Sequence, residues 1–533
     1  MKKTLYIAGG IAGAVILAAV IFVLTLDINS YKPRIEAAAS ETSGLQVAIG
    51  GKMRLTVFPD IGASLEGLSV KNKGADVFSA KEVSIGVELM PLLHKEVKVK
   101  SIEVVSPDVN VVKDRNGRYN FEALEKNKGE KEAAPDPFRI ASVSVKDGHI
   151  VYRDLKSGGK YEVSKCDIGM DGLTFVSGDA AKTVSFDGDI SCGAVSTKDM
   201  AASDISASLK ARAGDIEGEL SCGKVSAKAT AVSGIKTTFK IEGGDLAGDI
   251  TVKDVTNGKL KVSDISAAVK SSGKKYVADG INLKLFGGTG TGSVKADMTG
   301  KTPAYTVDFK LAGLRVEETL AAFDKKQSMR GPLDLTARLA LNGKTARDFE
   351  RTARGEFSVR GRDLAIQGMD LDAVLDKYEK SQSVSLYDVG SAVILGPLGP
   401  LLTKGFDFGG VYKESLGGAT TVRVFVSDWK VGGGAADAAD VAFSTKRNRV
   451  AMKGRLNLVE ERYENVRVAV LDKEGHATFT QRIQGDFRRP QVEKISAFKA
   501  VLGSVLGLFE KTKNLFVEEK REVFYDGSVK HPR

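Results

Sequence analysis

The chain contains the stretch DISCGAVSTKDMAASDI at residues 189–205 and, 30 positions later, ELSCGKVSAKATAVSGI at residues 219–235. The two copies are identical at nine of 17 positions, and a weaker third copy keeps Val255, Ser263 and Ile265 in register. A strand with its turn takes about 15 residues, so a unit of this length holds two strands. The repeat therefore predicts hairpins stacked side by side in an antiparallel sheet.

Alternation of apolar and polar residues continues the strand pattern beyond the repeat. Side chains at every second position of a strand point to the same face. Two stretches show this period, and their apolar positions are Tyr305, Val307, Phe309 and Leu311 in the first and Leu333, Leu335, Leu339 and Leu341 in the second. The sequence thus predicts a mostly β, elongated body with one apolar face, and we expect these eight side chains to line it.

Composition excludes several classes of protein. Of the 533 residues, 42% are hydrophobic and 27% are charged, which is too apolar for a disordered chain. Glycine is frequent at 58 residues and proline scarce at 12, which excludes collagen-like and proline-rich chains. The net charge of +10 is concentrated near the end, since residues 445–533 hold 19 Lys and Arg against 12 Asp and Glu.

The N-terminus predicts a membrane anchor. Residues 4–26 carry no charge and follow Lys2 and Lys3. As a helix they would cover about 34 Å, enough to cross a hydrocarbon core of about 30 Å. No cleavage site follows closely, so we expect residues 1–27 to be an uncleaved signal anchor. The two lysines place the remaining chain across the membrane, which in a bacterium is the periplasm.

Changes in composition and in hydrophobic pattern along the chain predict its domains. Residues 28–124 form an N-terminal unit that starts with a helix over residues 27–43 and continues in short strands. Residues 125–137, EKNKGEKEAAPDP, read as a charged linker. A repetitive β body occupies residues 138–490, with short helices expected at 316–323 and 370–378. Residues 491–533 form a basic amphipathic helix and a tail.

The expected C-terminal helix, residues 495–516, has an apolar face with lysines outside it. That face consists of Phe498, Val501, Leu502, Val505, Leu506 and Phe509. One interpretation places it in an anionic membrane leaflet or on a docking partner. The other has it close the end of the β body and shield a sheet edge. Both stay open at the level of sequence.

Motifs for catalysis or metal binding are missing from the chain. Its four histidines have no metal-ligand spacing. The glycine-rich run at 287–295, GGTGTGSVK, lacks the lysine position of a phosphate-binding loop, so we expect a turn there. Three cysteines leave at least one unpaired, and Cys192 and Cys222 at equivalent repeat positions are either bridged or two small buried residues. We expect no metal, no cofactor and no enzymatic activity.

Several motifs resemble the AsmA family of bacterial envelope proteins. They are the Tyr-Lys-Pro-x-Ile start at 31–35, the Gly-x-x-x-x-Ile-x-Gly turn at 44–51, Phe-Pro at 58–59, Pro-Leu-Leu at 91–93, Ser-Pro-Asp-Val at 106–109 and Gly-Arg-Tyr-Asn-Phe at 117–121. The stretches at 283–298, 304–320, 329–345, 355–372 and 476–495 are similar to the family's C-terminal region. The resemblance is weakest over about 170–270.

The resemblance implies an inner-membrane-anchored periplasmic protein with a long curved sheet whose apolar concave face forms a groove. Such a protein is related to TamB and to bridge-like lipid transfer proteins. Binding of lipid acyl chains, phospholipid transport and outer-membrane assembly are the implied function. Implied partners are membrane phospholipid, the inner membrane through residues 4–26 and an outer-membrane or envelope protein, with no nucleic acid. The alternative is a scaffold for outer-membrane protein assembly, whose sheet closes into a packed sandwich.

Overall fold

The computed structural model describes residues 27–532 except for 57–60, 89, 92–93, 95, 97, 122–137, 176–183, 324–328, 374, 376–417, 488, 494–495 and 498–521. It divides into two compact units, Met1–Val255 and Thr256–Arg533. The described chain is mostly β with few helices, as predicted. The unit boundary falls inside the region predicted as one body at 138–490.

The first unit opens with a short 3-10 helix, η1 (Ile28–Tyr31), and α2 (Lys32–Ser43), which confirm the helix predicted at 27–43. Gly44 ends α2 in the left-handed conformation, with φ of 69°. The strands that follow are β1 (Gln46–Ile49), β2 (Met53–Thr56), β3 (Ile61–Asn72), β4 (Ala75–Val87), β5 (Val99–Val105), β6 (Asp108–Lys113), β7 (Phe138–Asp154), β8 (Gly159–Phe175), β9 (Val184–Thr197), β10 (Met200–Arg212), β11 (Asp215–Ala227), β12 (Thr230–Glu242) and β13 (Asp245–Asn257).

The sheet of the first unit is antiparallel except at one joint, which corrects the expectation of a wholly antiparallel sheet. Strands β5 and β6 lie end to end beside β4 and both pair with β7 in parallel. Between them Ser106, at φ of 46°, donates its backbone N–H to Lys146 O at 2.7 Å. Parallel neighbours need a long connection, and here the chain between Lys113 and Phe138 makes it. The predicted linker at 125–137 belongs to that connection and lies outside the described residues.

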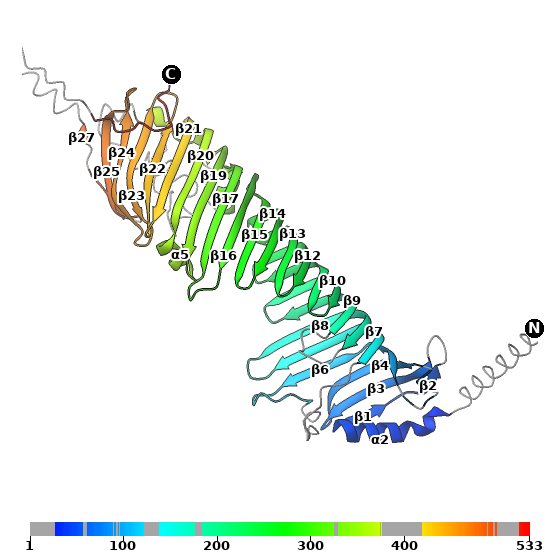
Figure 1. Cartoon of the computed structure of the whole chain (residues 1–533). Helices are drawn as coiled ribbons and strands as arrows, with labels where there is room; N and C mark the ends of the chain where they lie inside the picture. The colour runs from blue at the N-terminus through cyan, green and yellow to red at the C-terminus, as the bar shows by residue number, and fades with distance from the viewer. Residues whose placement is uncertain are drawn as a thin grey trace, which may run out of the picture. The chain divides into compact units, whose positions relative to one another are not determined.

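The repeat forms hairpins, as predicted. β9 to β12 pair in chain order, each strand antiparallel to the next, with two strands in each 30-residue copy (Figure 1). At the turn between β10 and β11, Ala213 and Gly214 both have positive φ, 50° and 99°. Two such residues give a turn whose twist matches that of the flanking strands.

The cysteine pairing differs from the one considered from the repeat. Cys166 on β8 lies opposite Cys192 on β9, and these two form the disulfide, with Cα atoms 4.1 Å apart. Cys192 and Cys222 both lie opposite Ile205, on either side of β10. A whole strand therefore separates them, about 9.6 Å at 4.8 Å per step, which is too far for a bridge. Cys222 is a buried free thiol.

The second unit is also built mainly as an antiparallel ladder. Its strands are β14 (Leu260–Ser272), β15 (Lys275–Leu285), β16 (Gly288–Asp297), β17 (Ala304–Arg315), β18 (Met329–Arg330), β19 (Pro332–Asn342), β20 (Arg354–Gln367), β21 (Ala419–Gly432), β22 (Ala435–Ser444), β23 (Arg449–Asn457), β24 (Arg462–Leu471), β25 (Ala477–Asp486), β26 (Arg489–Val492) and β27 (Ser496–Ala497). From β14 to β25 neighbours in the chain pair, apart from short β18, which pairs with β20 so that β17 pairs with β19.

Helices in the second unit are short. α4 (Val316–Ala322) confirms the helix predicted at 316–323, and residues 371–373 are helical at the start of the one predicted at 370–378. α5 (Ala346–Thr352) was not predicted. Its signal is a capping box, in which the Thr345 side chain accepts from the Asp348 N–H and the Asp348 carboxylate accepts from Thr345 N–H.

The glycine-rich run at 287–295 is strand rather than turn beyond its first residue. Gly288, Gly290 and Gly292 lie in β16, between β15 and β17. A Cβ on Gly290 would lie 2.7 Å from Leu283 Cδ1 and 2.8 Å from Phe309 Cζ. Gly290 therefore makes room for large side chains of the adjacent strands, whereas a Cβ on Gly292 would lie 2.3 Å from the backbone oxygen of Asp308.

The tail of the chain packs onto the second unit and covers its sheet from the side opposite the main core. Val426, Ala442, Ala451 and Ala469 form one cross-strand row on β21 to β24, and Phe524, Tyr525 and Val529 pack against it. The main core lies on the other face. Covered on both faces, these strands carry continuous apolar runs instead of alternation.

Two predicted membrane elements lie outside the described residues. One is the anchor at residues 4–26, and the other is the apolar face at 498–509. Among the residues that the structure describes, no helix is long and apolar enough to cross a membrane. The predicted C-terminal helix is corrected at its start, because Ser496 and Ala497 form β27, which pairs with Phe479 and Thr480 of β25.

Candidate functional site

Strands β9 to β12 of the first unit have one apolar face. Residues opposite one another in the ladder share a face, so the register defines cross-strand rows. Three rows on this face contain Phe186, Ala211, Ile216 and Ile241; Ile190, Ala207, Leu220 and Thr237; and Cys192, Ile205, Cys222 and Ile235. The row of Ile190 continues to Ile168 on β8 and Val145 on β7. The face thus runs across six consecutive strands.

The opposite face of the same strands is charged and hydroxylated. Asp187, Lys210, Glu217 and Lys240 form a row of alternating sign across β9 to β12. Arg212 Nη2 adds an ion pair to Asp187 at 2.6 Å. Two clefts of about 970 and 680 Å³ share Ser208, Glu219, Thr238 and Asp249 of this face, and the lining of the first also includes Ile168, Ile190 and Leu220. Such a surface suits contact with water.

The apolar face is only partly covered. Ala211 and Cys222 are buried at 5% and 7% exposure, whereas Leu220 is 36% exposed and Ile190, Ile216 and Ile241 are half-buried. A sheet face that belonged to a packed core would be covered throughout, as β21 to β24 are. This face instead offers aliphatic surface along successive strands, with no polar group demanding a fixed position, which suits a hydrocarbon chain.

The eight side chains predicted to line the groove share one face of β17 and β19. Three of the cross-strand pairs are Tyr305 with Leu341, Val307 with Leu339 and Leu311 with Leu335. Phe309, Leu335, Leu339 and Leu341 are partly buried against the main core of the second unit. Tyr305 stacks edge-on against Phe349 of α5 at 5.5 Å between ring centres.

Leu311 and Leu333 are not open to a ligand, and this corrects their prediction as lining residues. They are 3% and 1% exposed and belong to the core. The cause is α4 and the strands that follow, because Val316, Leu320 and Phe425 join the same cluster. Alternation fixes the face of a side chain but not what covers that face.

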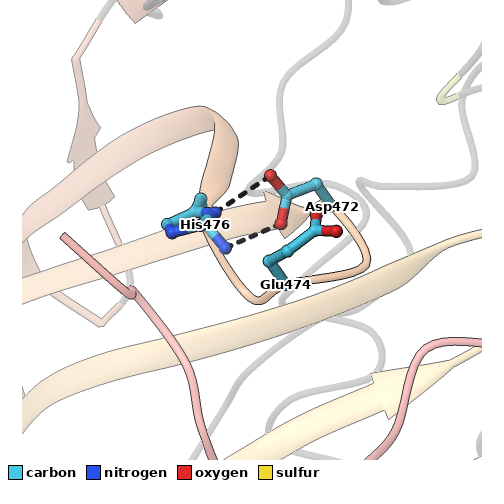
Figure 2. Close-up of side chains that lie close together, drawn as sticks. All are labelled: Asp472, Glu474 and His476. Atoms are coloured by element: carbon cyan, nitrogen blue, oxygen red, sulfur yellow. Dashed lines mark hydrogen bonds and ion pairs between the residues drawn. The ribbon is translucent and has the colours of Figure 1, made fainter. Parts of the chain in front are cut away.

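A cluster of three ionisable residues near the end of the second unit was not singled out from sequence. Asp472, Glu474 and His476 have possible metal-ligand atoms that all lie within 4.8 Å of one another (Figure 2). Among the described residues, this is the one group of three such side chains that lie close enough to share a metal ion. Asp472 Oδ1 accepts the N–H of Gly475 at 2.9 Å and of His476 at 2.8 Å, and His476 Nδ1 lies 3.2 Å from Asp472 Oδ2.

This cluster is explained by the turn that it closes. Burial raises the pKa of Asp472, but hydrogen bonds from the backbone and ring of His476 outweigh it and keep the pKa below its usual range. The Arg449 guanidinium donates to Asp472 O at 2.8 Å, and Tyr525 N–H donates to Gly475 O at 3.0 Å. The positive charge of Arg449 beside the loop disfavours a metal ion there. The hydrogen bond from Tyr525 N–H to Gly475 O positions the tail.

The side chains predicted to line a groove did not include the apolar face of β9 to β12. Its signal was present, because Ile205, Ala207, Leu209 and Ala211 alternate with Ser206, Ser208, Lys210 and Arg212. Because many residues of these strands are alanine, glycine or serine, the inward and outward positions differ little in size and polarity. The longer aliphatic side chains of residues 305–341 give the stronger pattern.

Fold and faces together define a class: repetitive β-sheet proteins with an apolar face left partly open along successive strands. The chain belongs to the AsmA family, whose family model matches residues 1–207 and 224–391. The break in the match, residues 208–223, falls in the repeat and covers the end of β10, the turn and the first part of β11. The stretch at 476–495 lies beyond the end of the match. Searches of curated proteins and of solved structures found no match.

Proposed function

We propose that this protein binds lipid acyl chains on the apolar face of its sheet and supports phospholipid transport and outer-membrane assembly from the periplasmic side of the inner membrane. The observation that carries the proposal is the half-exposed apolar face across β7 to β12, with Leu220 at 36% exposure. AsmA family membership supports an envelope role.

The energetic argument concerns hydrocarbon in water. Exposing a methylene group to water costs about 0.8 kcal/mol, so a chain of many methylenes crosses an aqueous compartment only when covered. Aliphatic contact is non-directional, and a lipid can shift along it without breaking a fixed set of hydrogen bonds. No chemical step is required, and we propose that the protein acts without catalysis or a cofactor.

The scaffold alternative draws on a different part of the molecule. At β21 to β24 the sheet is packed on both faces, as a closed sandwich would be. The two readings make opposite claims about β9 to β12, since a scaffold would use its polar face and leave the apolar face without lipid.

Photo-crosslinking distinguishes lipid binding from the scaffold role. A benzophenone amino acid replaces Leu220 or Leu339 on the apolar face, or Ser221 or Arg338 as the adjacent control on the other face, in the full-length protein in cells. We expect lipid adducts from Leu220 and Leu339 and at most a trace from the controls. Equal labelling at paired positions, or none at either, would contradict lipid binding on this face.

A further inference from the structure

The helical segment of η1 and α2 closes the first edge of the sheet with polar side chains. Backbone N–H groups of β1 and β2 donate to this segment in three places: Val47 to Ser40 Oγ at 2.9 Å, Ile49 to Glu36 Oε1 at 2.6 Å and Met53 to Asn29 Oδ1 at 2.8 Å. These bonds satisfy donors that an edge strand would otherwise offer to another chain. They also fix the position of α2 on the edge.

The apolar side chains of this segment do not face the sheet in the usual way. None of the residues of α2, all of which the structure describes, is buried. Tyr31, which ends η1, is 49% exposed, Ile35 is 38% exposed, and Ala38 is exposed too. Their spacing of four and three residues places them in one stripe along the helix. An amphipathic helix normally turns such a stripe toward its own core, so this orientation indicates an apolar partner outside the described part of the chain.

The stripe begins close to the end of the predicted membrane anchor. The anchor is expected at residues 4–26, and Asp27 caps η1 by accepting the N–H of Asn29 at 3.1 Å. A 3-10 helix rises about 2 Å per residue, so Tyr31 lies within about 8 Å of Asp27 whatever direction the helix takes. The headgroup layer on one side of a bilayer is about 5–8 Å thick. With the anchor in the bilayer, Tyr31 is thus at the level of the headgroups or at their outer border, where tyrosine is enriched.

The direction of α2 decides where the rest of the stripe lies. An upright helix would place Ala38 about 10 Å further from the bilayer than Tyr31, at about 1.5 Å per residue, and would leave Ile35 in water. A helix along the surface keeps all three side chains at the boundary of headgroups and acyl chains. Arg34 is exposed four residues before Ala38, on the same side of the helix, and can reach lipid phosphate from there.

We propose that α2 lies along the surface of the inner membrane, with Tyr31, Ile35 and Ala38 in the headgroup layer, and holds the edge formed by β1 and β2 at the bilayer. The inference rests on the proposed function, because it requires the inner-membrane location. It adds a second membrane contact besides the anchor. Since α2 is bonded to the edge, this contact fixes the first strands of the sheet beside the bilayer that supplies the lipid.

The test measures the membrane depth of single side chains of α2 in the full-length protein, reconstituted into vesicles of phosphatidylethanolamine and phosphatidylglycerol. Cys222→Ala removes the free thiol and leaves the Cys166–Cys192 disulfide intact. In that background Ile35→Cys carries the environment-sensitive dye NBD, and the vesicles contain lipids with a nitroxide near the start of the acyl chain. The nitroxide quenches dyes at the headgroup boundary.

The matched control is Ala37→Cys, two residues along the same helix and exposed on its other flank. We expect nitroxide lipids to quench the dye at Ile35→Cys at least about three-fold more than at Ala37→Cys, because a helix along the surface immerses one flank only. Tyr31→Cys should behave like Ile35→Cys, and it serves as a second position if the dye at residue 35 disturbs folding.

The outcomes distinguish this inference from the proposed function. Failure of the full-length protein to float with the vesicles would contradict the inner-membrane location and with it the proposed function. A protein that floats but shows equal quenching at Ile35→Cys and Ala37→Cys overturns the surface position of α2 and leaves the function standing. A dye at Ile35→Cys that has blue-shifted emission but is not quenched by the lipids would identify a protein contact, which also overturns the membrane contact.

Discussion

Single glycines hold places in the sheet that no side chain can take. Gly355 on β20 lies opposite Leu339 and Val431, at φ of 135°. A Cβ added there would sit 2.0 Å from Arg338 O, a backbone atom that cannot move away alone. The conformation and the contact both exclude a side chain.

We expect Gly355→Ala to lower the free energy of unfolding of the second unit by about 2 kcal/mol or more. The control is Gly432→Ala, where nothing lies within 4 Å of the added atom. It should be neutral or slightly stabilising, because alanine restricts the unfolded chain. Urea unfolding of the two variants measures the difference, and equal midpoints would count against the packing argument.

His149 ties three strands together with its ring. Its Nδ1 lies 2.9 Å from Asp108 Oδ2 on β6, and its Nε2 lies 3.3 Å from Glu162 Oε1 on β8. The bond to Asp108 raises the pKa of His149, burial opposes it, and Glu162 adds to the rise. Because the folded pKa lies above the ordinary value of about 6.5, the stabilisation is complete below that pH and is lost as pH rises through the folded pKa.

We therefore expect amides of β6 and β7 to exchange faster at pH 8.5 than at pH 6, after correction for intrinsic rates. His149→Gln should remove most of this pH dependence, while His94→Gln, in a loop apart from these strands, should keep it. Hydrogen exchange by mass spectrometry gives the measurement. An unchanged pH dependence in His149→Gln would show that other groups cause the pH dependence of exchange in β6 and β7.

At the scale of elements, the disulfide links the paired strands β8 and β9 covalently. The two cysteines are 26 residues apart in the chain, and residues 176–183 lie between the strands that they join. Closing a loop of this length stabilises a fold by about 3 kcal/mol, mainly by restricting the unfolded chain.

We expect Cys166→Ala/Cys192→Ala to lower the stability of the first unit by roughly that amount. Cys222→Ala, at a free cysteine on the same face, should cost less than about 1.5 kcal/mol. Limited proteolysis of the full-length protein, followed at cleavage sites within residues 138–255, compares them. A loss as large in Cys222→Ala would mean that packing on this face, and not the bridge, accounts for the effect.

Hydrogen bonds to Asp440 on β22 hold the C-terminal tail against the second unit. Tyr525 Oη donates to Asp440 Oδ1 at 2.5 Å, and Ser528 donates to Asp440 Oδ2 from both its backbone and its hydroxyl. Burial raises the pKa of Asp440, yet the bonds from Ser528 and Tyr525 bring it below its usual range. The tail thereby covers β21 to β24 from the side opposite the main core, so these strands have no open apolar face to offer a lipid.

At the scale of the whole molecule, the proposed function depends on an apolar face that stays accessible in the folded protein. Leu220→Lys places a charge on that face at a half-exposed position and should cost less than about 1.5 kcal/mol in stability. We expect it to reduce co-purified lipid several-fold and to impair the phenotype that depends on this protein in cells. Ser221→Lys, one residue along the same strand on the polar face, should retain both. Equal lipid in the two variants would contradict passage over Leu220.

The sequence by itself determined what depends on near neighbours. Period-2 alternation predicted the strands and the shared face of Tyr305, Val307, Leu339 and Leu341, and the 30-residue repeat predicted hairpins, because side-chain direction in a strand is a local property. The family motifs predicted membership that the family model confirms.

The tertiary structure decided what depends on residues distant in sequence. It paired Cys166 with Cys192, because strand order places them opposite one another while β10 separates Cys192 from Cys222. It buried Leu311 and Leu333 under elements that follow in the chain and left Leu220 uncovered. All three have the same alternation, and coverage by another part of the chain is a non-local property that no short pattern encodes.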